Sequence, residues 1–286
     1  MTNAKITIVR TRVIKVMFLI LIPTILAASN SVSSCGSAIT NSGTWTLTQN
    51  LTCTGNGIDV QAGNVILKLN GFTITGPGTN AGTGVLVASS EGTRLNKVTL
   101  VGPGTITNFQ NGIVFQGTNG GGAVDLVIEN NLMGILLLSD TAAVIPSSLL
   151  ISQNQLQSSA ESISGPLAAS TIVGNSCSDS EDCINLVDAS GNKILGNLCN
   201  GNRHAGIEVG ANAGGSVSTG NTVEGNQTSN NRFYGIFLGP DSSGNHLIGN
   251  VAFQNRFLDI NEFNPHCGSD SFLSDVFGRA SQSCVK

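Results

Sequence analysis

The sequence predicts an all-β solenoid, a single coil of short parallel strands joined by tight turns. Three observations predict it: a short phrase recurs along the chain, an apolar run led by Ile follows each copy about ten residues later, and helix formers are scarce among 36 Gly and 10% charged residues. The phrase reads IVGN ending at Asn175, ILGN at Asn197, VEGN at Asn226 and LIGN at Asn250. Degraded copies are ISQN ending at Asn154, VIEN ending at Asn130, LVGP around Gly102 and LKLN ending at Asn70.

Residues 1–28 are predicted to be a signal peptide. Four basic residues precede an apolar stretch from Val16 to Leu26, and Ala27, Ala28 and Ser29 provide small residues for cleavage. The apolar stretch is short for a membrane span, although an uncleaved anchor and a lipid attached at Cys35 remain alternatives. We therefore expect a secreted or cell-surface protein with no membrane span after cleavage.

Residues 29–69 are expected to form an N-terminal cap with the first strands, 70–263 the coils, and 264–286 a C-terminal cap. Two short strands can be recognised in each repeat. The second is the clearer one and reads GVLVA at Gly84, GIVFQ at Gly112, GILLL at Gly134, INLVD at Ile184, GIEVG at Gly206 and GIFLG at Gly235. Successive phrases are 21 to 32 residues apart, which is too short for a strand plus a crossover helix in most coils.

The recurring Asn and Gly residues are interpreted as structural. They cluster where the chain must turn through left-handed backbone conformations. Identical Asn side chains on successive coils can also form a hydrogen-bonded ladder.

All seven Cys residues follow the leader, and export permits disulfides. Cys35 and Cys53 flank the start of the solenoid and Cys267 and Cys284 its end, so these pairs are predicted to close the open ends. Cys177 and Cys199 hold the same place in successive repeats and would stack within bridging range. A local bond between Cys177 and Cys183 competes with that pair, and the odd number leaves one buried thiol.

The chain resembles secreted right-handed parallel β-helix proteins with pectate-lyase-like repeats. The resemblance covers Cys35 to Lys286 and is most specific in the first block, from CGSAITNSGTWTLTQNLTC to LNGFTITGPG, and in the last, CGSDSFLSDVFGRASQSCVK. It implies a right-handed parallel β-helix, and its members include pectate lyases, polygalacturonases, epimerases and proteins without an assigned reaction. The family's usual Asp and His are replaced here by Lys68 and Phe72.

Two neighbouring clusters are weak candidates for catalysis. Paired Asp residues typical of polygalacturonases are absent from the sequence. A lyase would need a Ca²⁺ cradle of carboxylates and a base, and the nearest sets are Asp179, Glu181 and Asp182 on one coil with Arg203, His204 and Glu208 on the next. A solvated turn and an ordinary coil explain the same residues, so the sequence assigns no metal, and Ca²⁺ is expected only if the protein is a lyase.

Three Arg residues form a candidate ligand-binding column. Arg203, Arg232 and Arg256 each lie six residues after the key Asn and four before the Ile of the second strand, so they should stack. Stacked guanidinium groups favour an anionic ligand, solvent or acidic partners, and either Glu181 or Ser180 could hold the preceding position. Phe233, Tyr234 and Phe257 adjoin the column and suit sugar faces, unless they belong to the core.

These patterns lead to three hypotheses. The first is a monomeric exported protein that binds acidic polysaccharide or a cell-surface glycan, the second a lyase or glycoside hydrolase acting on a uronate-rich polymer, and the third a purely structural surface protein. Without the leader, 9 basic and 17 acidic residues remain, a net charge of −8 that argues against nucleic acid as a partner. Insertions at 118–123, 140–148 and 211–219 are the loops expected to project and carry specificity.

Overall fold

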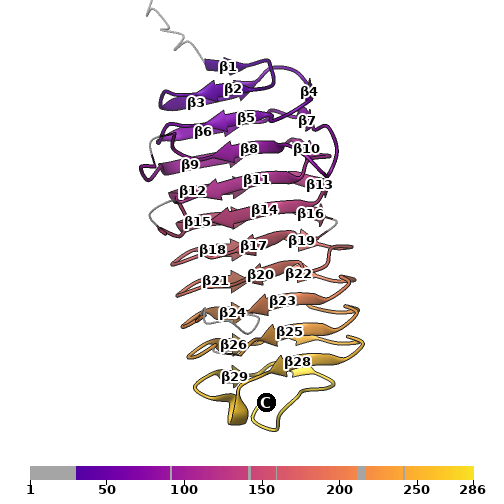
Figure 1. Cartoon of the computed structure of the whole chain (residues 1–286). Helices are drawn as coiled ribbons and strands as arrows, with labels where there is room; N and C mark the ends of the chain where they lie inside the picture. The colour runs from indigo at the N-terminus through magenta and orange to yellow at the C-terminus, as the bar shows by residue number, and fades with distance from the viewer. Residues whose placement is uncertain (1–29, 91, 141–142, 159, 211–216, 241) are drawn as a thin grey trace, which may run out of the picture.

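The chain winds into a parallel β-helix whose coils stack one upon the next along the whole molecule (Figure 1). The computed structural model describes residues 30–90, 92–140, 143–158, 160–210, 217–240 and 242–286. The predicted signal peptide, 1–28, lies outside the described residues, as does 211–216 of the third predicted insertion. Among the described residues, no helix is long and apolar enough to cross a membrane.

The strands form three long sheets, here called sheets A, B and C. Sheet A contains β1 (Asn30–Val32), β3 (Gly43–Leu47), β6 (Val65–Lys68), β9 (Asn96–Val101), β12 (Asn119–Val124), β15 (Ser147–Ser152), β18 (Thr171–Val173), β21 (Lys193–Leu195), β24 (Thr222–Glu224), β26 (His246–Ile248) and β29 (Ser271–Leu273). Sheet B contains β2 (Ser37–Ile39), β5 (Ile58–Val60), β8 (Thr83–Val87), β11 (Asn111–Gln116), β14 (Met133–Leu138), β17 (Ile163–Gly165), β20 (Ile184–Leu186), β23 (Ala205–Val209), β25 (Tyr234–Leu238) and β28 (Leu258–Glu262). Sheet C contains β4 (Leu51–Thr52), β7 (Thr73–Thr75), β10 (Thr105–Thr107), β13 (Val127–Asn131), β16 (Gln155–Ser158), β19 (Ser176–Cys177) and β22 (Leu198–Cys199), and is continued by the pair β27 (Val251–Ala252) and β30 (Val276–Phe277). A 3₁₀ turn, η1, spans Pro265–Cys267.

Coils therefore carry up to three strands where the sequence had suggested two. The recurring phrases are strands of sheet A, except VIEN, which is β13 of sheet C, and the Ile-led runs are strands of sheet B. The strands of sheet C are as short as two residues, too short for a visible alternation of apolar and polar positions. The insertion expected at 118–123 is also wrong, because Asn119–Val124 is β12, paired on both edges within sheet A.

The core is built from columns of identical positions on successive coils. Along sheet B, from β5 to β28, one inward column consists of Ile or Val, and each member is fully buried: Ile58, Val85, Ile113, Ile135, Ile163, Ile184, Ile207, Ile236 and Ile260. β-branched side chains suit this flat stacking, since their restricted χ1 leaves one packing arrangement that every coil can repeat.

Glycine precedes this Ile on several coils because the coils approach closely there. A Cβ on Gly112 would lie 2.7 Å from the carbonyl oxygen of Gly134 on the next coil. Only glycine therefore fits at the entry to these strands.

The predicted Asn ladder is confirmed, and it is one of three. In each, the backbone N–H and the side-chain Nδ2 of one Asn both donate to the Oδ1 of the next member, which lies on the next coil except for Asp259, four residues after Asn255; the two Ser members donate through the backbone N–H. The ladders are Asn154, Asn175, Asn197, Asn226, Asn250 and Asp275; Ser170, Asn192, Asn221, Asn245 and Asp270; and Ser180, Asn202, Asn231, Asn255 and Asp259. The copy at VIEN is out of register, because Leu126 and not Asn130 donates to Asn154.

Each ladder ends on an Asp at its C-terminal end. The last Asn of each ladder needs an acceptor for its backbone N–H and its Nδ2–H. No Asn follows the Asp, so the Asp has no ladder partner to which it could donate. A carboxylate supplies the acceptor without a donor that would itself go unpaired. This explains why Asp259, Asp270 and Asp275 are buried.

Disulfides join the predicted terminal pairs, Cys35 to Cys53 and Cys267 to Cys284. The bond at Cys35 occupies the sulfur to which a lipid would be attached. Strands β1 to β6 of the expected N-terminal cap already belong to the three long sheets, and β29 and β30 extend them into 264–286.

The three central Cys residues lie together in the core. Cys177 and Cys199 stack in register as expected, but Cys183 is within disulfide range of both, with Cα separations of 5.3 and 5.6 Å. Because one sulfur takes part in only one disulfide, Cys183 can bond to only one of the two, and such a bond would leave the other as a buried thiol.

Candidate functional site

The candidate site begins in the turns that enter sheet B on three successive coils. In each turn a buried Asn of the third ladder is followed by Arg and then by a ring: Asn202, Arg203 and His204; Asn231, Arg232 and Phe233; Asn255, Arg256 and Phe257. The Asn holds the turn from inside the coil, and the next residue faces solvent. The turns thus present the same surface position once per coil.

The backbone register stacks the three Arg residues as the spacing predicted. The N–H of Arg232 donates to the carbonyl of Asn202 at 2.8 Å, and that of Arg256 to Asn231 at 2.9 Å. The N–H of Arg203 donates to Ser180 in the same way, so Glu181 holds the preceding position. Ser180 instead begins the third Asn ladder.

Two of these Arg residues line a shallow hollow with aromatic rings. Arg232, Phe233, Arg256 and Phe257 surround about 300 Å³. Phe233 and Phe257 are 43% and 57% exposed, which excludes the alternative that they belong to the core. Arg203 lies at the N-terminal end of the Arg column, where its Nη1 donates to the carbonyl of Asp179 at 2.7 Å. We call Arg203, Arg232, Arg256, Phe233 and Phe257 the Arg–Phe stripe.

Further rings extend the stripe across sheet B. Tyr234 stacks on Phe237 with ring centroids 5.1 Å apart and contacts Phe257 edge-on at 5.8 Å. Phe237 in turn contacts Phe263, which is 59% exposed. Contiguous exposed aromatic side chains are typical of interaction surfaces.

At the other end of the stripe, Asp182, His204 and Glu208 converge. Nδ1 of His204 lies 2.9 Å from Oδ1 of Asp182 and 3.5 Å from Oε2 of Glu208. Asp182 also accepts from the N–H of Ala205 at 2.7 Å. His204 bridges this cluster to the stripe, because its ring centroid is 5.6 Å from that of Phe233.

Burial determines the electrostatics of this cluster. Both carboxylates are almost fully buried, whereas the His204 side chain is 31% exposed. Burial raises the pKa of Glu208 to about 7, the neighbouring Asp182 carboxylate adds to the rise, and His204 opposes it. The hydrogen bond that the His204 ring donates to the Asp182 carboxylate raises the pKa of His204, and burial of the ring opposes this rise.

The other predicted acidic residues do not enter this cluster. Asp179 is an exposed turn residue with φ of 58°, and its Oδ2 accepts from Nε2 of Gln157 at 3.1 Å. Glu181 is exposed at the head of the Arg column. Of the three carboxylates on that coil, only Asp182 points toward His204.

Sequence reasoning missed the polar column beside the cluster. On the outer face of sheet B, Ser164, Asn185 and Glu208 are register partners on successive strands, all buried. The oxygens Ser164 Oγ, Asn185 Oδ1 and Glu208 Oε1 have no hydrogen-bond partner in the described part of the chain. The middle residue of ISG, INL and IEV is polar and alternates with the inward apolar residues on either side. This recurring outward polar position is the sequence signal that could have identified the column.

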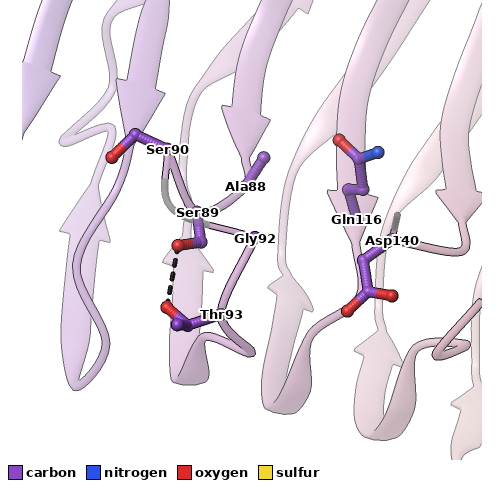
Figure 2. Close-up of a pocket in the computed structure, with 7 residues that line it drawn as sticks. All are labelled: Ala88, Ser89, Ser90, Gly92, Thr93, Gln116 and Asp140. Atoms are coloured by element: carbon purple, nitrogen blue, oxygen red, sulfur yellow. Dashed lines mark hydrogen bonds between the residues drawn. The ribbon is translucent and has the colours of Figure 1, made fainter. Parts of the chain in front are cut away.

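A second hollow lies far from these residues, between the loops that leave β8, β11 and β14 (Figure 2). Its walls carry small hydroxyl groups, including Ser89 and Thr93, whose side-chain oxygens are 2.9 Å apart. Among the residues drawn in Figure 2, Asp140 carries the one charge. Part of the predicted loop at 140–148 thus borders a hollow, but it offers no catalytic constellation.

Comparison with known proteins supports the fold. The family described as "right handed beta helix region" matches residues 111–264, more than half of the chain. The chain belongs to this right-handed β-helix family. No curated protein sequence matches it.

Solved structures similar to this chain are β-helix proteins at low identity. An alginate lyase from Paenibacillus sp. str. FPU-7 is 12% identical with a TM-score of 0.61, over 90% of this chain and 99% of the lyase. A variant of the periplasmic alginate epimerase AlgG is 15% identical with a TM-score of 0.57, over 87% and 73%. Pectate lyase Pel9A is 14% identical with a TM-score of 0.52, over 91% and 71%. At these identities the likeness establishes the shared fold.

Proposed function

We propose that the protein binds an acidic, uronate-containing polysaccharide along the Arg–Phe stripe. The observation that carries the proposal is the pairing of an exposed Arg with an exposed ring on successive coils. A guanidinium can hold a uronate carboxylate through two parallel hydrogen bonds. An aromatic face packs against the apolar face of a sugar ring.

The scaffold and the charge distribution favour this ligand. A solenoid offers a long surface on which equivalent positions repeat at the strand spacing of about 4.8 Å, which suits a polymer better than a small molecule. The chain without its leader is acidic overall, so three Arg residues in one column are a local exception. The similar structures named for alginate and pectate point to the same class of polymer.

Affinity electrophoresis of the protein in gels containing alginate, polygalacturonate or neutral dextran tests the proposal. The wild type should be retarded by an acidic polymer, and the double variant Arg232→Ala/Arg256→Ala should lose that retardation. Lys68→Ala/Lys193→Ala is the matched control, because it removes two exposed cations from sheet A. Equal retardation of both double variants would overturn the role of the stripe.

The rings are tested separately. Phe233→Ala/Phe257→Ala should weaken binding without changing its dependence on salt, because this variant keeps every charge. The Arg variant should reduce the salt dependence, since surface charge pairs are screened by ions. Retention of full affinity by the Phe variant would remove the rings from the binding surface.

A second candidate function is turnover of the same polymer by a lyase or hydrolase. The contact between His204 and Phe233 favours it, because it places the Asp182, His204 and Glu208 cluster at the end of the stripe. Unsaturated or reducing products that form with wild type and not with Asp182→Asn would support it. Binding without any product would leave the binding function alone, and no affinity for any polymer would favour a purely structural role.

A further inference from the structure

The cluster of Asp182, His204 and Glu208 has too little positive charge for its burial. Within the described residues the ion pairs of Asp182 and Glu208 are both with His204, so one imidazole serves two carboxylates. The two carboxyl side chains are 5% and 1% exposed. Buried carboxylates are retained only where a cation or a proton balances them.

Unpaired oxygens collect at the same place. Glu208 Oε1 has no partner among the described residues, although its side chain is 99% buried and its other oxygen faces His204. Asn185, the register partner of Glu208 on β20, donates its Nδ2 to Glu161 at 2.9 Å and leaves its own buried Oδ1 unpaired. Neighbouring buried acceptors without donors indicate an ion or water between them.

We propose that Asp182, His204 and Glu208 bind a divalent cation of the zinc or manganese type, with Asn185 Oδ1 as the adjacent oxygen. One donor atom from each of the three residues lies within 4.8 Å of the others. Ligands bound at about 2.0–2.2 Å lie about 2.8–3.1 Å apart on neighbouring corners of an octahedron and about 3.3–3.6 Å apart on those of a tetrahedron. The separations of 2.9 and 3.5 Å from Nδ1 fall close to these ranges.

The donor types select the class of metal. An imidazole nitrogen with two carboxylates suits Zn²⁺ or Mn²⁺, whereas Ca²⁺ takes six to eight oxygens. The His204 ring is exposed enough for an ion to enter from solvent. With Nδ1 on the metal, the ring proton sits on Nε2.

The proposal does not depend on glycan binding and is tested without a polymer. Protein freed of metal with EDTA is titrated calorimetrically with ZnCl₂, MnCl₂ and CaCl₂, and its thermal midpoint is measured with and without each ion. One equivalent of Zn²⁺ or Mn²⁺ should bind and raise the midpoint. Glu208→Gln and His204→Ala should each weaken binding by about 100-fold or more.

Two controls keep the result interpretable. Glu224→Gln removes an exposed carboxylate of sheet A and should bind the metal like wild type. Glu208→Gln without metal should be at least as stable as metal-free wild type, because it removes an unbalanced buried charge, and this would show that it folds.

Three outcomes would overturn the proposal. The first is the absence of heat and of any midpoint shift with Zn²⁺ and Mn²⁺, in which case a proton balances the cluster. The second is unchanged binding by His204→Ala and Glu208→Gln, which would place the ion elsewhere, for instance at the buried Cys residues. The third is binding of Ca²⁺ alone, which would remove the imidazole from the ligand set.

Discussion

Replacing Asn197 by Ala should destabilise the protein far more than the same change at a partly exposed Asn. Asn197 sits in the middle of the first ladder, fully buried. Its Oδ1 accepts from the backbone N–H and from Nδ2 of Asn175, both at 3.0 Å. Its Nδ2 donates to the carbonyl of Ile172 and to Oδ1 of Asn226, both at 3.0 Å.

The magnitude follows from the groups left unpaired. Asn197→Ala leaves the backbone N–H and one Nδ2 hydrogen of Asn175 without an acceptor. A buried group without a partner costs about 1–3 kcal/mol, so two cost about 2–6 kcal/mol. For a chain of this size each kcal/mol lowers the thermal midpoint by about 2–4 °C, which predicts a fall of at least about 4 °C.

Asn200→Ala is the matched control. Asn200 is half-buried, and its Oδ1 accepts one hydrogen bond from the N–H of Ser229. Its loss should cost about 1 kcal/mol. Thermal and urea unfolding followed by circular dichroism would compare the variants, and equal midpoints for Asn197→Ala and Asn200→Ala would refute the ladder as a source of stability.

Asn197→Asp sharpens the test. It keeps the acceptor but turns a carboxylate oxygen toward the carbonyl of Ile172 and the Oδ1 of Asn226. At neutral pH it should be at least as damaging as Asn197→Ala, although Asp275 is tolerated where the same ladder ends. Wild-type stability of Asn197→Asp would contradict this explanation of the terminal Asp residues.

Three further predictions concern pH, redox state and packing. Burial raises the pKa of Glu262 from 4.5 to about 7, so the folded state keeps a proton that the unfolded state loses. The free energy of unfolding, measured with urea, should therefore fall as the pH rises from about 4.5 to 7 and then level off, and Glu262→Gln should flatten this slope. A free energy of unfolding that rises over this pH range would contradict the prediction. Thiol titration of the denatured, unreduced wild type should detect one thiol per chain, and titration of Cys177→Ser or Cys199→Ser should detect none. Three thiols in the wild type would show that the central disulfide does not form. Gly112→Ala should lower the thermal midpoint, because the added Cβ would collide with the next coil. Gly55→Ala is the control and should leave the midpoint unchanged, because the space around its Cβ position is open. Equal midpoints for the two variants would contradict the close approach of the coils.

Sequence periodicity was sufficient for the architecture because each coil places the same position at the same point of the cross-section. Counting from the key Asn therefore gave the register of Arg203, Arg232 and Arg256 and the stacking of Cys177 on Cys199. The same counting failed at VIEN, because these residues form β13 of sheet C, whereas the other copies form strands of sheet A.

The candidate site could be predicted only in part. Asp182, His204 and Glu208 were among several acidic and basic residues on two coils, and the sequence did not separate them from Asp179 and Glu181. Their selection depends on which side chains turn inward at a bend that is one residue shorter than its neighbours.

The sequence by itself determined the coil, its columns and the sulfur pairs at its ends, because these repeat at fixed spacing along the chain. The tertiary structure alone decided which polar groups are buried together. It brought Asp182 to His204 across 22 residues, exposed Phe233 and Phe257, and placed Cys183 between two equally near partners. Burial and contact between coils depend on every neighbour at once, whereas periodicity records only the position of each residue within its own coil.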